Sequence, residues 1–116
     1  MAITIVNDSA SVDTTEYALA SDITWASRTP QTEDCWLQAW IDVQSMAAND
    51  VYEWRIVETT GVGGSEKNVM GPYRIVGAQA GPIVIAGLLV SQGWEIGVKK
   101  ISGTTRTVGW TLKKVT

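Results

Sequence analysis

The stretch CWLQAWIDVQSMAANDVYEWRIVETT, residues 35–60, decides the fold class. On both sides of the small polar segment 45–50, apolar and polar residues alternate with a period of two. This alternation is typical of β-strands that bury one face and expose the other. The stretch therefore predicts a β-hairpin, or two sequential strands, at the centre of an all-β domain.

The two predicted strands fill their faces differently. Trp36 and Trp40 share one face of the first strand, about 13 Å apart at the rise of a strand. The opposite face is also apolar, so this strand is expected either to be central and covered or to lie at a subunit contact. Leu37, Ala39, Ile41 and Val43 share the opposite face of the first strand, and Tyr52, Trp54 and Ile56 form the inward face of the second.

Turn-forming residues divide the rest of the chain into further strands, about eight in all, which is typical of a sandwich or barrel. The additional strands are expected at 2–6, 12–19, 69–76, 83–90, 94–102 and 105–115. The last two are predicted to form a hairpin around Gly103, and Gly71-Pro72 predicts an edge strand or a bulge. No helix is expected, and the best candidate, 44–49, is one turn at most. The chain thus predicts one antiparallel β-sandwich or jelly-roll-like domain over residues 1–116.

The segments between the strands give three further expectations. Residues 20–34 are predicted to be a long surface loop, and residues 61–68 a flexible connection. Trp25 either folds back onto the core as a lid or is offered to a partner, and the lid is favoured because single loop aromatics usually hide apolar area. On the strands, Trp54, Trp94 and Trp110 fall on inward faces and are expected to pack together.

The composition gives no sign of catalytic chemistry. The 116 residues include six Trp, three Tyr and no Phe, with one Cys and no His. One Cys excludes an internal disulfide, and the lack of His removes the usual general base and the commonest transition-metal ligand. Glu33-Asp34 could contribute to a glycosidase pair or a calcium site, but a solvated loop end is favoured. We therefore expect no enzyme, no catalytic residue, no metal and no cofactor.

The charge and hydropathy of the chain bear on which classes of partner it could bind. The formal net charge of −3 gives no reason to expect nucleic-acid binding. The longest apolar run, 82–90, is too short to span a membrane, and residues 1–10 do not resemble a signal peptide. Acids are concentrated in residues 1–58 and bases in residues 59–116. This asymmetry indicates either complementary faces that meet between copies or, as favoured, acidic and basic strands that are neighbours within one fold.

The chain resembles a family of small proteins encoded among phage virion genes, of the capsid decoration or stabilisation type. The resemblance lies in Gly93-Trp94-Glu95, Val98-Lys99-Lys100, 103–106 and Trp110 before a basic tail. It continues in Trp40-Ile41-Asp42-Val43, 47–50, 53–57, Ala78-Gln79-Ala80 and the N-terminal VDTTEY. It covers most of the chain, and its motifs are structural. The resemblance implies a non-enzymatic virion protein, made in the host cytoplasm, that binds the major capsid protein or other virion proteins and self-associates.

The candidate interface residues are Trp36, Trp40 and Trp25, because Trp is favoured at contact hot spots. The alternative is that Trp36 and Trp40 are covered by the second sheet or by the loop 20–34. Two other functions stay open: a neck- or tail-associated virion protein, and a small carbohydrate-binding module whose Trp pair stacks on sugar rings.

Overall fold

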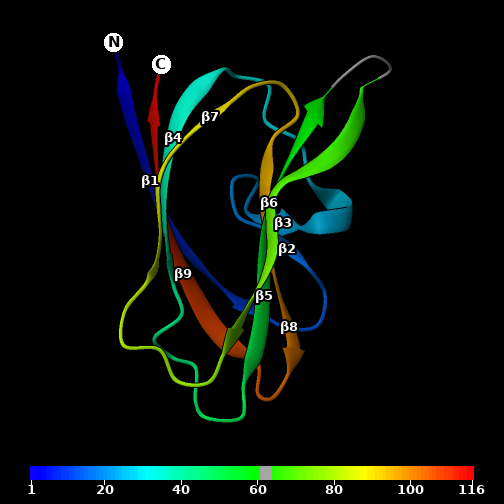
Figure 1. Cartoon of the computed structure of the whole chain (residues 1–116), viewed down its shortest axis with the longest axis vertical. Coiled ribbons are helices and arrows are strands. Elements are labelled where there is room, and N and C mark those ends of the chain that lie inside the picture. Colours follow the sequence, from blue (N-terminus) through cyan, green and yellow to red (C-terminus); the bar gives the residue numbers. More distant parts are fainter. Residues whose placement is uncertain (61–63) are drawn as a thin grey trace.

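The computed structural model describes residues 1–60 and 64–116 and arranges them in two antiparallel sheets that face each other (Figure 1). One sheet has four strands in the order β1-β9-β4-β7, and the other has five in the order β3-β2-β8-β5-β6. The chain is therefore the predicted all-β sandwich. Its two ends lie side by side, because Ala2 and Thr116 exchange backbone hydrogen bonds of 3.0 and 2.9 Å.

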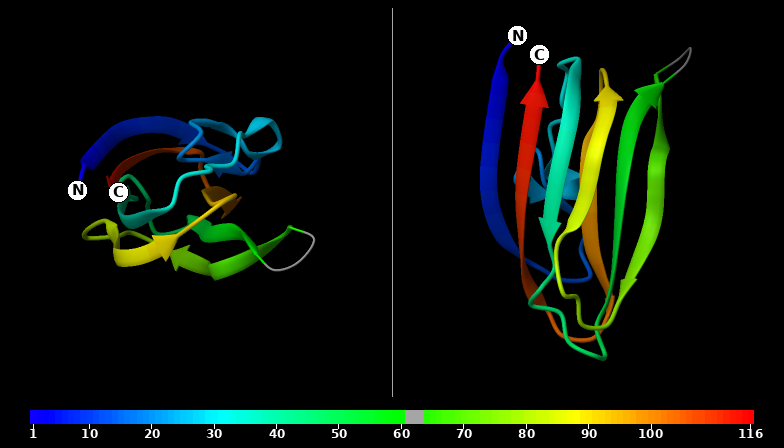
Figure 2. Two further views of the ribbon diagram at one scale, coloured as in Figure 1. Left: turned by 90° about the horizontal axis from the view of Figure 1, so that it is seen from above. Right: turned by 60° about the vertical axis from the view of Figure 1, so that its left-hand side comes forward.

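The strands of each sheet come from distant parts of the chain. The four-stranded sheet contains β1 (Ile3–Val12), β9 (Arg106–Val115), β4 (Cys35–Asp42) and β7 (Ile83–Val90). The five-stranded sheet contains β3 (Ile23–Thr24), β2 (Tyr17–Ala18), β8 (Glu95–Ser102), β5 (Val51–Thr60) and β6 (Ser65–Val76). Figure 2 shows the four-stranded sheet face-on, with β1 at its outer edge beside β9.

The strand pairing is that of a jelly roll. With the two-residue β3 set aside, the first strand pairs with the last, the second with the next to last, and so on inward: β1 with β9, β2 with β8, β4 with β7, β5 with β6. Contacts of β9 with β4 and of β8 with β5 complete the two sheets. This is the result of rolling one long antiparallel ribbon into a sandwich.

Two connections that the sequence suggested as hairpins instead cross between the sheets. β4 and β5 lie in opposite sheets, and so do β8 and β9, so the predicted hairpin around Gly103 is wrong. Of the two readings of residues 35–60, sequential strands is the correct one. The alternation of buried and exposed residues is the same in both arrangements, because each strand still has one inward face.

Asp50 stabilises the end of the sandwich where these two crossing connections meet. Its carboxylate accepts backbone hydrogen bonds from Ala47 and Thr104, both 2.8 Å, and pairs with Arg106 Nε at 2.7 Å. The bonds from Thr104 and Ala47, and then Arg106, lower the pKa of Asp50 to about 2. Gly103 has a φ of 95° and lies so close that a side chain there would collide with this carboxylate.

Several strand boundaries differ from the prediction. β1 continues through Asn7-Asp8-Ser9, which the sequence suggested as a break, because β9 supplies a partner for every residue from Ile3 to Val12. Of the strand expected at 12–19, Val12 ends β1 and only Tyr17–Ala18 form a separate strand. β6 begins at Ser65, so the predicted connection 61–68 is shorter, and residues 61–63 lie outside the described part of the chain.

Two local predictions have opposite outcomes. Gly71-Pro72 lies in the edge strand β6 beside register shifts, as predicted, and its peptide bond is cis. The expectation of no helix is wrong for Trp25–Ser27, which form a short 3₁₀-helix, η1, whereas residues 44–49 form only turns.

The core lies between the two sheets and contains Trp54, Trp94 and Trp110, each at most 7% exposed. Their inward placement is as predicted. Among the described residues, however, the ring pairs in contact are Tyr17 with Trp110 at 5.8 Å and Trp54 with Tyr73 at 5.2 Å. The three indoles therefore share one core but do not stack on one another.

Candidate binding surface

The outer face of the five-stranded sheet is covered over β8 by residues 20–34, which we call the strap. Glu95, on β8, is fully buried beneath it. The Glu95 carboxylate accepts hydrogen bonds from the backbone amides of Ala20 at 2.8 Å, Ser21 at 3.2 Å and Ile96 at 3.0 Å. Burial raises the pKa of Glu95, although these hydrogen bonds act in the opposite direction. The sequence placed Glu95 on a polar outer face, which is the correct face of β8, but the strap removes it from solvent.

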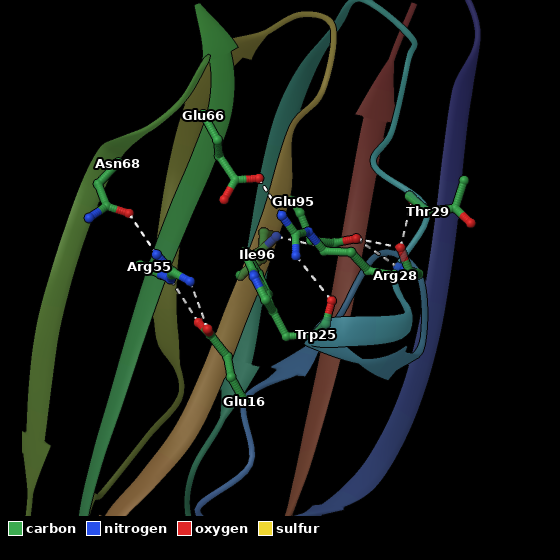
Figure 3. Close-up of polar contacts among 10 residues, drawn as sticks. Glu16, Trp25, Arg28, Thr29, Arg55, Glu66, Asn68, Glu95 and Ile96 are labelled. Carbon is green, nitrogen blue, oxygen red and sulfur yellow. Dashed lines mark hydrogen bonds and ion pairs between the residues drawn. The ribbon is translucent and has the colours of Figure 1, made fainter. Parts of the chain in front are cut away.

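Trp25 is the aromatic centre of the strap (Figure 3). The guanidinium groups of Arg28 and Arg55 lie 4.0 and 4.5 Å from its ring centroid. Glu16 accepts hydrogen bonds of 2.8 and 2.7 Å from Arg55, and Glu66 forms an ion pair with Arg28. These contacts tie η1 to β5 and β6.

The strap fits closely over β8 because β8 has a glycine beneath it. A Cβ at Gly97 would come within 2.8 Å of the Trp25 ring. The predicted surface loop thus contains β3, η1 and a β-bridge between Gln31 and Trp94. Trp25 takes the lid position that the sequence favoured, but it covers the outer face of a sheet rather than the core between the sheets.

The outer face of the four-stranded sheet has no such cover among the described residues. Ile3 is paired with Val115, Val115 with Trp36, and Trp36 with Leu89, so one apolar row crosses all four strands. Ile3, Trp36 and Leu89 are 61%, 51% and 68% exposed. A second row places Trp40, 43% exposed, beside Val84, 55% exposed.

We call this surface the apolar face; it consists of Ile3, Ile5, Trp36, Trp40, Val84 and Leu89. Polar groups lie among these residues: Asn7 and Thr111 continue the row of Trp40, and Gln38 and Lys113 continue the row of Ile5. Lys113 Nζ lies 4.8 Å from the centroid of the Trp40 ring. Exposed apolar patches on soluble proteins mark interaction sites, and on this face Lys113 and Gln38 lie between the Trp36 row and the Trp40 row.

The Trp36 indole lies against the sheet at Gly87. A Cβ at Gly87 would come within 2.8–2.9 Å of three atoms of that ring, so only glycine accommodates the indole there. Gly87 belongs to a bulge, because Ala86 and Gly87 of β7 both stand opposite Gln38 of β4. The sequence suggested Gly87 only as a bend in the strand.

The structure brings Trp36 and Trp40 together and separates them from Trp25, which lies over the other sheet. Covering of Trp36 and Trp40 by the second sheet or by residues 20–34, the alternative that the sequence left open, does not occur. Sequence reasoning missed Ile3, Ile5, Val84 and Leu89, because it did not give the strand order that makes them neighbours. A usable signal was the run 83–90, which is apolar at outward as well as inward positions.

The other residues singled out by the sequence have structural roles. Cys35 is buried, and burial raises the pKa of its thiol. Glu33 pairs with Lys114 at 2.6 Å. Four of the six ion pairs among described residues join an acid of residues 1–58 to a base of residues 59–116: Asp50–Arg106, Glu53–Arg74, Glu53–Lys99 and Glu33–Lys114. The charge asymmetry is thus used within the fold, as favoured from the sequence.

Within residues 1–60 and 64–116, no group of three or more His, Cys, Asp or Glu side chains could hold a metal ion. No pocket is present in this part of the chain. None of the helices described is long and apolar enough to cross a membrane.

Comparison with known proteins gives one distant structural likeness. No family model matches the chain, and no curated protein matches it. The chain is similar to the crystal structure of a Yersinia pseudotuberculosis-derived mitogen, with a TM-score of 0.46 and 12% sequence identity over 97% of this chain and 85% of the mitogen chain. A likeness at this level carries no conclusion about the binding surface.

Proposed function

We propose that the protein is a non-enzymatic bacteriophage virion structural protein, a decoration or stabilising protein that binds the shell of major capsid protein. The observation that carries the proposal is the apolar face, where two tryptophans about half exposed lie among exposed aliphatic side chains on one face of a sheet. The family resemblance of the sequence supplies the kind of partner.

The apolar face suits a repetitive shell. Tryptophan anchors dominate the energetics of many protein interfaces. Trp36 and Trp40 are already half covered, so burying their remaining area contributes on the order of 1 kcal/mol each. A single such contact is weak, but a shell presents many equivalent sites, and neighbouring copies hold one another at high effective concentration.

Quantitative mass spectrometry of purified particles tests this function. A copy number comparable to that of the major capsid protein is expected for a decoration protein. A few copies per particle would instead place it in the neck or tail, which is the alternative within the virion. Complete absence from particles would contradict the virion proposal.

A carbohydrate-binding module is the second candidate, favoured by one specific observation. Trp36 lies against Gly87, and Gln38, Lys113 and Thr111 supply hydrogen-bonding groups beside the two indoles. From the sequence alone, polar residues did not appear concentrated here, because β9 and β4 are far apart in the chain. A glycan array decides: binding that the Trp36→Ser variant loses would support this function, and no signal for the wild type would remove it.

A further inference from the structure

The free edge of β1 has a regular set of unused backbone groups at its N-terminal half. Ala2 and Thr116 form a hydrogen-bonded pair, and such pairs alternate along an antiparallel ladder. Thr4 and Val6 therefore direct their amides and carbonyls to β9, while Ile3, Ile5 and Asn7 direct theirs to the free edge. All the residues of this half are exposed.

The free edge is closed further along the strand. The Ser9 amide donates to the Asp8 carboxylate at 2.8 Å, so it is occupied by a side chain of its own strand. The uninterrupted run of free backbone groups is thus Ile3, Ile5 and Asn7, which the occupied Ser9 amide separates from Ser11.

The other three sheet edges formed by described strands carry features that obstruct strand addition. β3 is two residues long. β6 contains Pro72 after a cis peptide bond, together with Glu66, Lys67 and Arg74. β7 is bulged at Ala86-Gly87, and the Gln38 side chain donates to the Ala86 carbonyl at 3.2 Å. Short strands, prolines, charges and bulges are the usual protection of exposed edges, and residues 3–7 of β1 have none of them.

We propose that this edge binds the same edge of a second copy of the chain, antiparallel and about a two-fold axis at Ile5. In this register Ile3 is opposite Asn7, Ile5 is opposite Ile5, and Asn7 is opposite Ile3. Every free amide and carbonyl of the three residues then has a partner, about two hydrogen bonds for each pair. A register shifted by two residues toward Ser9 meets an occupied amide, and a shift the other way leaves Asn7 without a partner from the same three residues.

The pairing joins two four-stranded sheets into one continuous sheet. Ile5 of each copy lies beside its counterpart, and the two apolar faces become one surface on the same side of the joined sheet. A C2 dimer with an isologous contact is the commonest form of self-association. The inference is independent of the proposed function, because it concerns the free protein in solution.

Sedimentation velocity over a concentration series tests the inference, with far-UV circular dichroism to confirm folding. The contact is short, so it is sought up to roughly millimolar concentration. For the wild type, the weight-average mass is expected to rise toward twice the monomer mass of 12.5 kDa. Ile5→Pro removes the central amide, which β9 does not use, and should keep the protein monomeric. Ile5→Thr keeps that amide and should retain the dimer.

A second measurement needs no substitution. In amide hydrogen exchange followed by NMR, Ile3, Ile5 and Asn7 should become protected as concentration rises, while the Thr4 and Val6 amides are protected throughout. A wild type that stays monomeric, or three edge amides that exchange freely in the associated protein, would overturn the inference. Association retained in Ile5→Pro but lost in Trp36→Ser/Trp40→Ser would place the contact on the apolar face and overturn it too.

Discussion

Tryptophan is covered on the outer face of one sheet and exposed on the outer face of the other. On the five-stranded sheet, Trp25 is covered by two arginines and belongs to the strap, beneath which the Glu95 carboxylate is buried. On the four-stranded sheet, Trp36 and Trp40 are left about half exposed. Residues 20–34 cover the outer face of one sheet, whereas no described segment covers the outer face of the other. The contrast indicates that the strap serves stability, whereas the apolar face is available for binding.

The largest loss of stability is expected for a substitution on the inner face of the four-stranded sheet. Trp110 is 3% exposed and contacts Tyr17 of the other sheet, so Trp110→Ala removes a core aromatic that packs the two sheets together. The free energy of unfolding should fall by about 3–5 kcal/mol. Urea unfolding followed by circular dichroism measures this loss, and a near-wild-type midpoint would contradict the described core.

A substitution under the strap, on the outer face of the five-stranded sheet, should lower the free energy of unfolding by less than Trp110→Ala does. Arg55→Met removes the ion pair with Glu16 and one of the two cations over Trp25, while keeping the aliphatic stem. We expect a loss of about 1–3 kcal/mol, since Arg55 is mostly buried and its bonds are charge-assisted.

Arg74→Met is the matched control on the same sheet. Arg74 is 63% exposed and pairs with Glu53 only at 3.8 Å, so its loss should cost about 0–1 kcal/mol. Equal losses in the two variants would show that the strap contacts add no stability beyond an ordinary surface pair.

The two buried carboxylates predict opposite dependences on pH. The folded pKa of Asp50 is lowered, so its contribution to stability is present above the ordinary value of 3.8 and is lost as the pH falls toward about 2. The folded pKa of Glu95 is raised, so its contribution is present below 4.5 and is lost as the pH rises through the folded pKa. In thermal melts across this range, the melting temperature of the wild type should fall as the pH drops from 3.8 toward about 2. The Asp50→Asn variant should lack this fall. An unchanged acid-side decline would contradict the role given to Asp50.

Substitutions on the apolar face should have the smallest effect on the free energy of unfolding. Trp36→Ser and Trp40→Ser should each change the free energy of unfolding by no more than about 0.5–1 kcal/mol, because their rings already contact solvent. Trp25→Ser should cost more than either, since it also uncovers β8. If Trp25→Ser proves the mildest of the three in urea unfolding, the contrast between the two faces fails.

Local patterns in the sequence predicted which way each side chain points, and these predictions hold well. The period of two in residues 35–60 placed Leu37 and Ile41 on one face of their strand and Trp36 and Trp40 on the other, and Tyr52 on an inward face, as observed. Proline at position 72 correctly indicated an edge strand or bulge, because proline cannot donate to a ladder.

Relations between distant strands could not be read in this way. An alternating strand has the same pattern whether its neighbour lies in its own sheet or in the facing one, so both crossing connections were open to a hairpin interpretation. For the same reason, only Trp36 and Trp40 of the six residues of the apolar face were singled out from the sequence, because neighbours such as Leu89 and Ile3 depend on the strand order. The burial of Glu95 depends on the strap, which has no period of its own.

The most direct test of the binding surface is hydroxyl-radical footprinting of the tryptophans, in the free protein and on purified particles. In the free protein, Trp36 and Trp40 should oxidise fastest, Trp25 more slowly, and the core residues Trp54, Trp94 and Trp110 slowest. On the particle, Trp36 and Trp40 should become protected while Trp25 keeps its rate. Trp36 and Trp40 that react equally in both states would contradict the assignment of the apolar face as the surface that binds the shell.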